Sequence, residues 1–346
     1  MNDDLAQSVA LTDQSTVGEA RRLARVFASR LPFSEGDVER VAIGVTEAAT
    51  NVVRHAGKGE LVLVPVLHER APALALLALD RGPGMPDLER CMRDGYSTGG
   101  TAGTGLGALK RQAELLEIYA PRGKGTALLA VFRARGVPAD DAPVTNPLAE
   151  VPFVTGALRL VYPGETECGD EWALARTERG AAILVSDGLG HGPAARQASA
   201  EAVRAFEARP DLDPAVVLEH AGIAARHTRG AAVSVAAVDA SARTVRYAGL
   251  GNVSGMLLTG FGHQGLLGHS GIVGQESRKI TSNAYPWPQE SVLVMHSDGL
   301  GTRWRPEDYP GLLAQHPLLV AGVLVRDHRR ARDDVAVVVA RWVTAR

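Results

Sequence analysis

The sequence predicts a chain of the α+β class that folds as two domains. Its 346 residues exceed what one hydrophobic core usually serves. In the second half, strand patterns occur in runs rather than in strict alternation with helices, which is typical of layered antiparallel sheets. A proline-containing stretch without periodicity, residues 136–150, predicts a linker between domains 1–135 and 151–346. An ordered strap packed between the domains would have the same composition.

The composition excludes several classes of function. The chain is 45% hydrophobic and 22% charged, with a net charge of -2 and both signs interspersed, so we expect no nucleic acid or acidic membrane as partner. No uninterrupted apolar stretch reaches membrane-spanning length, and the acidic start Met1–Asp4 is unlike a signal peptide. Cys91 and Cys168 lack a C-x-x-C partner and are predicted to be free thiols, which suits a cytoplasmic protein.

The first half shows two amphipathic helices, two strands, a third helix and a closing strand. Apolar residues recur at helical spacing in the first two segments, and Pro32 and Gly57 mark their ends. The predicted helices are 17–31, 35–55 and 109–118, and the predicted strands are 61–67, 73–79 and a strand that opens at 123–126 and ends at Phe132.

Polar residues in this half form a candidate nucleotide site. Glu47 and Asn51 are four apart and share a helix face, where they could position a nucleophile and a magnesium ion together. A solvated polar pair on a helix surface would look the same. Asp80 follows a strand and precedes Gly82 and Gly84, although a hairpin turn would share this pattern.

A stretch rich in glycine and hydroxyl residues, 95–107, leads directly into a predicted helix. Backbone N–H groups at a helix N-terminus suit a triphosphate. The stretch lacks the P-loop pattern and does not follow the first strand of a dinucleotide fold, so neither common nucleotide-binding fold fits.

Together these motifs resemble the GHKL family of ATP-binding domains, over about residues 16–135. The resemblance implies an α/β sandwich that binds ATP and Mg²⁺, with Glu47 as catalytic base and Asn51 on the metal. The segments 49–57 and 105–111 most resemble the RsbT-type switch kinases, and no phospho-accepting histidine helix precedes the domain. The residues implied to contact the nucleotide, besides Asn51, are Asp80, Gly82, Gly84, Gly103, Gly105, Gly107 and Thr126, and Gly125 matches the closing motif together with Thr126.

Acidic residues in the second half follow or precede strand patterns. Asp187-Gly188 follows the apolar run 181–185, and Asp298-Gly299 follows the run 292–297. Either dipeptide alone could be only a turn. Asp170 and the pair Asp333-Asp334 also border strand patterns, and so many carboxylates beside strands favour a shared site. Converging carboxylates are tolerated when cations neutralise them, and hard oxygen ligands favour magnesium, manganese or calcium.

The remaining pattern of this half predicts an antiparallel layered sandwich. The segment Tyr285–Pro288 is expected to form a rigid loop outside any strand because of its two prolines. The predicted helices are 194–208 and 214–226, and the predicted strands are 155–161, 172–177, 181–186, 231–238, 244–248, 254–258, 278–281 and 291–297.

From about residue 151 onward, the acidic motifs resemble the metal-dependent Ser/Thr protein phosphatases, in particular their SpoIIE-like and RsbX-like bacterial branch. The resemblance implies an α/β/β/α sandwich with two Mn²⁺ or Mg²⁺ ions bridged by the catalytic Asp187. Asp333 is preferred to Asp334, and His191 is expected to lie at a helix entry rather than to bind metal. The implied metal ligands are Asp170, Asp187, the Gly188 carbonyl, Asp298 and Asp333.

The two resemblances imply a bifunctional regulator of bacterial stress signalling. One domain would phosphorylate a protein serine or threonine and the other would remove the phosphate. The implied partner is a STAS-type anti-anti-sigma or stressosome protein, with a sigma factor or a downstream switch phosphatase as further candidates. In the alternative, the first domain only binds a partner and ATP, and the phosphatase alone turns over.

Overall fold

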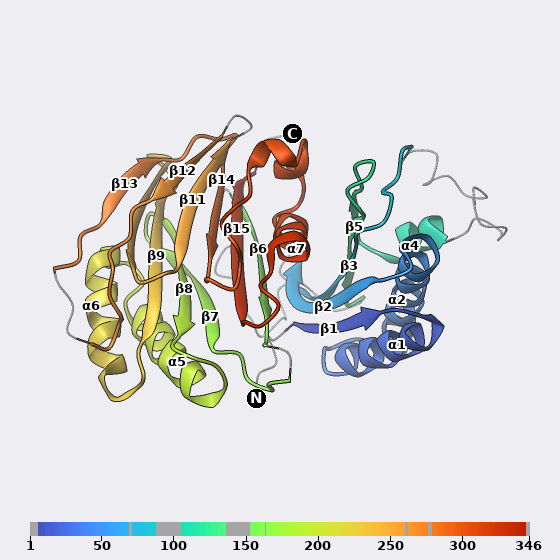
Figure 1. The fold of residues 1–346 in the computed structure, drawn as a ribbon, viewed down its shortest axis with the longest axis horizontal. Coiled ribbons are helices and arrows are strands. Elements are labelled where there is room, and N and C mark those ends of the chain that lie inside the picture. The colour runs from blue at the N-terminus through green and yellow to red at the C-terminus, as the bar shows by residue number, and fades with distance from the viewer. Residues whose placement is uncertain are drawn as a thin grey trace. The chain divides into compact units, whose positions relative to one another are not determined.

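The computed structural model describes residues 6–68, 71–87, 105–135, 153–162, 164–259, 262–275 and 279–343. The chain forms two compact units, Met1–Asn146 and Pro147–Arg346, each built of helices and antiparallel sheet (Figure 1). The predicted α+β class is therefore confirmed. The predicted linker 136–150, Gly103 and Cys91 lie outside the described residues. None of the described helices is both long enough and apolar enough to span a membrane.

The first unit is one five-stranded sheet in the order β1-β2-β3-β5-β4, in which each neighbouring pair is antiparallel. Helices lie against one face of this sheet (Figure 1), and their apolar sides share one core with strand residues such as Leu61, Leu76 and Phe132. The strands are β1 (Gln7–Leu11), β2 (Gly59–His68), β3 (Ala71–Asp80), β4 (Leu115–Tyr119) and β5 (Ala127–Arg133), and the helices are α1 (Gln14–Ala28), α2 (Glu35–Ala56) and α4 (Gly105–Gln112).

The first two predicted helices are confirmed, and local signals fix their ends. Asp13 and Ser34 each close a capping box at the start of α1 and α2, which satisfies backbone N–H groups that the helix leaves unpaired. Gly57 ends α2 with a φ of 75°. Within α2, Gly44 allows close approach to the sheet, because a Cβ there would collide with the Phe132 ring.

The predicted helix 109–118 is wrong in its second half. Helix α4 ends at Gln112, and residues Leu115–Tyr119 form strand β4 instead. Leu116 and Ile118 pack on the core two residues apart, which is the period of a strand rather than of a helix. Strand β1 was not predicted, since its five residues are mostly polar or small.

The second unit contains two five-stranded sheets that pack face to face. One has the order β13-β10-β9-β8-β7 and the other β12-β11-β14-β15-β6. The strands are β6 (Phe153–Leu160), β7 (Asp170–Thr177), β8 (Gly180–Gly188), β9 (Ala231–Asp239), β10 (Thr244–Leu250), β11 (Ser254–Thr259), β12 (Gly262–Leu266), β13 (Asn283–Pro286), β14 (Val292–His296) and β15 (Val335–Trp342).

Helices cover the outer faces of both sheets, which gives the predicted α/β/β/α layering (Figure 1). Helices α5 and α6 pack on β7 to β10, and α7 packs on β6 and β15. One core lies between the two sheets and a second core lies under α5 and α6. The helical segments are α5 (Pro193–Ala208), α6 (Pro214–Ala224), α7 (Pro317–His328) and the 3₁₀ turns Ala225–His227, Pro306–Asp308 and Leu312–Ala314.

Two predictions for this unit are wrong at the sheet edge. The predicted strand 278–281 does not form in its described part, and β13 begins instead at Asn283. Tyr285 and Pro286, predicted to lie outside any strand, belong to β13, because an edge strand tolerates a proline. Helix α7 was missed because residues 317–325 are all buried, so no amphipathic period marks it.

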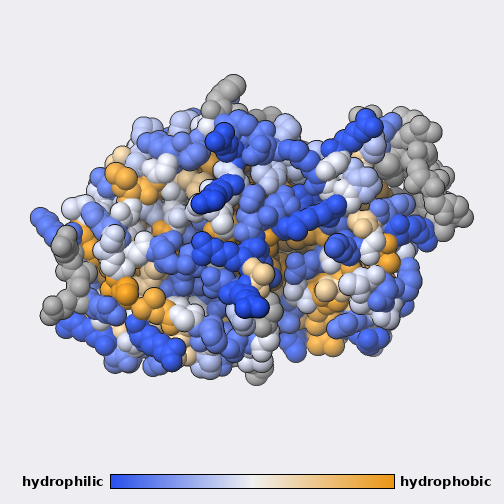
Figure 2. Space-filling model, in the orientation of Figure 1, coloured by the Kyte–Doolittle hydropathy of each residue, from blue (hydrophilic) through white to orange (hydrophobic). Residues whose placement is uncertain are grey.

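The surface agrees with the ordinary composition of the chain. The visible face is largely hydrophilic, with separate hydrophobic patches (Figure 2). The large hydrophobic side chains that are exposed in the described residues lie in separate parts of the chain, and they are Val26, Ile43, Ile223, Leu267 and Val343.

Candidate functional site

Antiparallel pairing of β7 and β8 brings the first two acidic residues together. Asp170 opens β7 and Asp187 lies near the end of β8, and the two residues are direct partners in the sheet register. Directly opposed residues on antiparallel strands point to the same face. Two carboxylates from consecutive strands therefore share one corner of the sandwich.

The second sheet brings two further carboxylates to this corner. Asp298 follows β14, and its backbone N–H donates a hydrogen bond to the Asp187 carboxylate. Asp333 precedes β15, and its charge acts on Asp170, Asp187 and Asp298. Strand ends from both sheets thus form an acidic cluster of Asp170, Asp187, Asp298 and Asp333.

Burial and mutual repulsion raise the pKa of three carboxyl groups in this acidic cluster, those of Asp170, Asp187 and Asp333. Burial, followed by the charge of Asp187, raises the pKa of Asp170, and a hydrogen bond from Ser297 only partly opposes this. Burial and the charges of Asp298 and Asp333 raise the pKa of Asp187 to about 7. Burial and the charge of Asp298 likewise raise the pKa of Asp333 to about 6. The ionised cluster needs a counter-charge that these four side chains do not supply.

The donor set fits hard divalent cations. Asp170 is 3% exposed, and its Oδ2 has no hydrogen-bond partner among the described residues. Within the same residues, no three acidic, histidine or cysteine side chains stand close enough to form a finished metal site. The four carboxylates still act on one another through their charges, because charges act over longer distances than ligand bonds and like charges keep apart without a cation. Carboxylate oxygens are the ligands that magnesium and manganese prefer.

Asp334, the neighbour of Asp333, has a different environment. Its Oδ1 accepts the Tyr162 N–H at 2.6 Å and its Oδ2 accepts the Gly169 N–H at 2.7 Å. Asp334 is 3% exposed, and its oxygens accept one buried backbone donor, from Gly169, and one partly buried donor, from Tyr162. This arrangement favours Asp333 as the ligand, and it gives Asp334 the task of fixing the backbone beside Asp170. Sequence reasoning missed that task because the Asp-Asp pair carries no signal that separates the two roles.

Gly188 and the loop that follows it shape the same corner. A Cβ at Gly188 would collide with the Ala195 carbonyl, so the glycine lets α5 begin directly against the end of β8. His191, in the loop before α5, has its Nδ1 2.7 Å from Glu165 Oε1 and stacks on Tyr162 with ring centroids 5.3 Å apart. These contacts suit a residue that packs at the helix entry.

In the first unit, the turn after β3 is organised around Asp80. Its Oδ1 accepts the backbone N–H of Gly82 at 2.7 Å and of Thr126 at 3.1 Å, and its own N–H donates to the Thr126 carbonyl. Gly125 has a φ of +75° and donates its N–H to the Gly82 carbonyl. Asp80 is only 7% exposed. One carboxylate therefore joins the end of β3 to the start of β5.

Helix α2 packs against this turn. A Cβ at Gly82 would come within 2.7 Å of the Ala56 Cβ, and α2 also contacts β3, β5 and α4. Glu47 and Asn51 are partly buried residues on the same helix. The structure therefore brings their helix to the Asp80 turn, while their catalytic and metal-binding roles stay predictions.

Of the predicted nucleotide-contacting glycines in this region, Gly84 occupies a position with little space. Gly84 has a φ of +72°, and a Cβ there would meet the backbone of Pro121. Gly105 and Gly107 lie in the first turn of α4, where backbone N–H groups are free of intrahelical partners. Gly103, predicted to belong to the same phosphate lid, lies outside the described residues.

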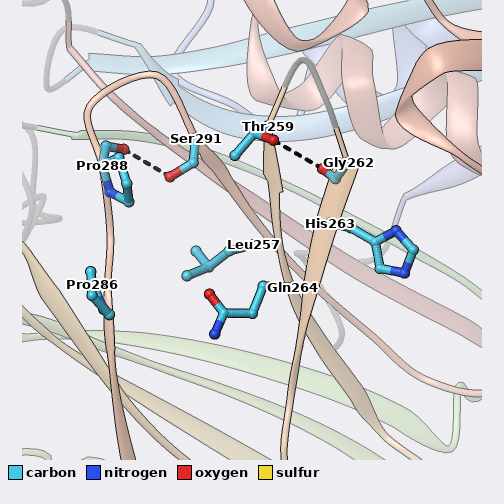
Figure 3. A pocket seen from close by; sticks show the side chains of 8 residues that line it. All are labelled: Leu257, Thr259, Gly262, His263, Gln264, Pro286, Pro288 and Ser291. Atoms are coloured by element: carbon cyan, nitrogen blue, oxygen red, sulfur yellow. Dashed lines mark hydrogen bonds between the residues drawn. The ribbon is translucent and has the colours of Figure 1, made fainter.

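A cavity of about 300 Å³ lies elsewhere in the second unit (Figure 3). Its lining includes Leu257, His263 and Ser291. Ser291 precedes β14 whereas Asp298 follows that strand, so the cavity and the acidic cluster lie at opposite ends of β14. The cavity therefore contributes nothing to the carboxylate chemistry.

Two regions of the chain match known families. Residues 10–132 match the family described as "Histidine kinase-like ATPase domain". Residues 177–343 match the family described as "Stage II sporulation protein E (SpoIIE)". The matched regions coincide with the parts that hold the Asp80 turn and most of the acidic cluster, since only Asp170 precedes the second region.

Individual relatives support both matches. The serine/threonine-protein kinase RsbT of Bacillus subtilis (strain 168) is 34% identical over 131 residues, which cover 38% of this chain and 97% of RsbT. The phosphoserine phosphatase RsbX of the same organism is 27% identical over 147 residues, 42% of this chain and 74% of RsbX. A solved structure described as "The bacterial stressosome: a modular system that has been adapted to control secondary messenger signaling" matches at 27% identity with a TM-score of 0.51, over 55% of this chain and 99% of that one.

Proposed function

We propose that the chain both adds and removes a phosphate on one partner protein, because its first unit belongs to the histidine kinase-like ATPase family and its second unit resembles the family described as "Stage II sporulation protein E (SpoIIE)". The target would be a serine or threonine. The single observation that carries the phosphatase half is the gathering of Asp170, Asp187, Asp298 and Asp333 from two sheets into one acidic cluster. We propose that the reactions take place in the cytoplasm.

In the phosphatase half, the carboxylates of the acidic cluster, including that of Asp187, and the Gly188 carbonyl would hold two Mg²⁺ or Mn²⁺ ions. Such ions activate water and neutralise phosphoryl oxygens at neutral pH. The protein itself fixes the positions of the carboxylates that would hold the ions. The Asp298 N–H orients the Asp187 carboxylate, and Asp334 anchors the backbone next to Asp170. No serine or cysteine nucleophile is required.

In the kinase half, Asn51 would hold the Mg²⁺ of ATP, and Glu47 would orient or deprotonate the hydroxyl that receives the phosphate. Their shared helix α2 packs against the Asp80 turn. Asp80, Gly82 and Gly84 would surround the adenine end of the nucleotide, and Thr126 would contact the nucleotide from the closing motif. The glycines 103, 105 and 107 would cover its phosphates at the start of α4.

The partner is proposed from the relatives. RsbT is named a serine/threonine-protein kinase and RsbX a phosphoserine phosphatase, and the third relative comes from a stressosome. We therefore infer a STAS-domain anti-anti-sigma or stressosome-like protein that is phosphorylated and dephosphorylated at the same residue. A sigma factor or a downstream switch phosphatase would be a further binding partner.

The phosphatase is tested with a phosphoserine form of a STAS protein in the presence of Mn²⁺. We expect phosphate release by the wild-type chain, its loss on chelation, and its loss in Asp187→Asn. Asp211→Asn is a matched control, because Asp211 is an exposed aspartate whose Oδ1 accepts the Glu178 N–H. Full turnover in Asp187→Asn would contradict the assignment of the acidic cluster.

The kinase is tested separately by incubating the chain with labelled ATP and the same unphosphorylated STAS protein. We expect transfer of the label in the wild type and loss of transfer in Glu47→Gln, which keeps the size of the side chain but cannot accept a proton. A stable complex with the STAS protein and ATP, without transfer, would favour the alternative in which the first unit is a binding module. Unchanged transfer in Glu47→Gln would show that Glu47 is not the base.

A further inference from the structure

Arg330 is a basic side chain that approaches the acidic cluster. Its Nη1 lies 3.7 Å from Asp298 Oδ2, and its side chain is 56% exposed. Burial and the charge of Asp298 raise the pKa of Asp333, and the positive charge of Arg330 opposes that effect. Arg330 thus stands next to two of the carboxylates that would hold cations.

The backbone fixes Arg330 at this place without help from its side chain. The Arg330 N–H donates to the Gly299 carbonyl at 2.8 Å, directly after Asp298. Leu300 and Arg329 form an antiparallel bridge, and the Gly301 N–H donates to the His328 carbonyl at 2.9 Å. The segment that carries Arg330 is therefore paired with the turn that carries Asp298, and removal of the guanidinium leaves this pairing intact.

Two neighbouring arginines in this segment have different surroundings. The Arg329 Nη2 donates to the Val161 carbonyl at 2.7 Å, which ties the segment to the residue after β6. Arg330 instead points its guanidinium toward Asp298 from the solvent side. Its position therefore needs an explanation other than support of the fold.

The contact between Arg330 and Asp298 does not satisfy either group. A separation of 3.7 Å exceeds a hydrogen bond, and Asp298 Oδ2 already accepts the Asn252 amide at 2.7 Å. An exposed ion pair of this length adds little to stability. The five N–H donors of a guanidinium are arranged to bind the oxygens of a phosphate in a forked manner.

We propose that Arg330 binds the phosphoryl group of the substrate at the rim of the acidic cluster. The proposal rests on the phosphatase function proposed above. A doubly charged phosphoryl group that approaches these carboxylates is repelled unless positive charge surrounds it. Cations held by Asp298 and Asp333 would supply part of that charge, and Arg330 would add directed hydrogen bonds from the solvent side.

The test measures equilibrium binding of inorganic phosphate to the full chain at saturating Mn²⁺, by calorimetry and without turnover. We expect Arg330→Ala to weaken phosphate binding by about 10- to 100-fold, the range for a hydrogen bond between charged groups. Arg330→Lys should recover part of the loss, since it restores the charge without the fork. Arg332→Ala is the matched control: it removes an exposed arginine two residues away and should change binding by less than about twofold.

Two further measurements separate phosphate binding from effects on the metal. Mn²⁺ affinity without phosphate should stay equal or become tighter in Arg330→Ala, because a positive charge next to the ligands has been removed. With a phosphoserine peptide, KM should rise more than kcat falls if the contact is present in the bound substrate. Thermal unfolding should be unchanged, since the backbone pairing of the segment is kept.

Unchanged phosphate binding in Arg330→Ala would overturn the proposal, as would a loss explained entirely by weaker Mn²⁺ binding. Failure of the phosphatase function has a separate signature, namely no phosphate release from the phosphoserine substrate by the wild-type chain. Because the binding measurement involves no turnover, an Arg330-dependent phosphate site would still be detected in that case. A wild-type chain that binds no phosphate at saturating Mn²⁺ would also overturn the proposal.

Discussion

The carboxylates at the candidate sites of the two units differ in their hydrogen bonding and in the charges around them. Asp80 in the first unit accepts backbone N–H groups from Gly82 and Thr126, so its charge is satisfied inside the protein. Asp170 and Asp187 in the second unit repel each other, and Asp170 Oδ2 has no partner among the described residues. A buried carboxylate that accepts hydrogen bonds from the backbone stabilises the fold without a ligand. A group of carboxylates that repel one another is stabilised when a bound cation neutralises their charge. This difference can be tested by mutation.

The largest expected effect is that of Asp187→Asn. Phosphatase activity should fall on the order of 10³-fold, because the variant removes the carboxylate that we propose as a ligand of both cations. The same variant should unfold about 2 to 4 °C higher than the wild type in the presence of chelator, because relief of repulsion worth about 1 kcal/mol shifts a unit of this size by that amount. Activity assays and thermal unfolding with and without Mn²⁺ measure both effects. A lower unfolding temperature in chelator would contradict the repulsion between Asp187 and its neighbours.

Asp80→Ala in the first unit should lower the stability of the fold, whereas Asp187→Asn should raise it in the absence of metal. Two partly buried N–H groups would lose their charged acceptor, so the free energy of unfolding of this unit should fall by about 3 kcal/mol. ATP binding should be lost together with stability. Chemical denaturation and nucleotide titration measure these effects, and Asp80→Asn, which keeps one oxygen acceptor, is the control with the smaller loss. Equal stability of Asp80→Ala and the wild type would show that the turn does not depend on this carboxylate.

These opposite signs also show what the sequence could reveal. Asp170, Asp187, Asp298 and Asp333 could be predicted as a set, because each lies beside a strand pattern and strand ends meet at the edges of a sheet. The role of Asp334 could not be predicted, because its partner Gly169 lies 165 positions away and only the folded chain pairs them.

The errors in the predicted fold also arise where contacts between distant parts of the chain decide the structure. The apolar residues of β4 are too few to distinguish a strand from the continuation of α4, and pairing with β5 decides the outcome. Pro286 could be accommodated only because β13 became an edge strand, a property of the assembled sheet. Amphipathic helices such as α1 and α2 were predictable because their period and caps are local.

Asp334→Asn sharpens the comparison further, because Asp334 is a satisfied carboxylate next to the unsatisfied cluster. An amide retains one of the two oxygen acceptors, so either the Tyr162 N–H or the Gly169 N–H loses its partner. We expect Mn²⁺ affinity to fall by about tenfold, as for other residues that hold a ligand in place. Calorimetric titration with Mn²⁺ measures this. Unchanged affinity would mean that Asp170 is positioned without the Asp334 anchor.

The smallest expected effect concerns the acid stability of the first unit. The pKa of Asp37 is lowered overall. Burial alone would raise it, but hydrogen bonds from Ser34 and the Arg135 N–H, together with the charge of Arg40, outweigh the effect of burial. A carboxylate with a lowered pKa adds stability that is fully present above its unfolded value near 4 and is lost as the pH falls through its folded value. The unfolding free energy of this unit should therefore decrease as the pH falls below about 4.

The variant Asp37→Asn isolates this contribution. It should be less stable than the wild type at pH 7, because the buried Arg40 loses its ion pair, and the difference should shrink as the pH is lowered below about 4. Asp13→Asn is a suitable control, because Asp13 is likewise a helix-capping aspartate with a lowered pKa but is exposed, so its smaller loss should reflect the cap alone. Denaturant unfolding of the wild type and both variants between pH 3 and pH 7 measures the slopes. A difference between Asp37→Asn and the wild type that stays constant with pH would show that the Asp37 carboxylate has the same pKa in the folded and unfolded chain.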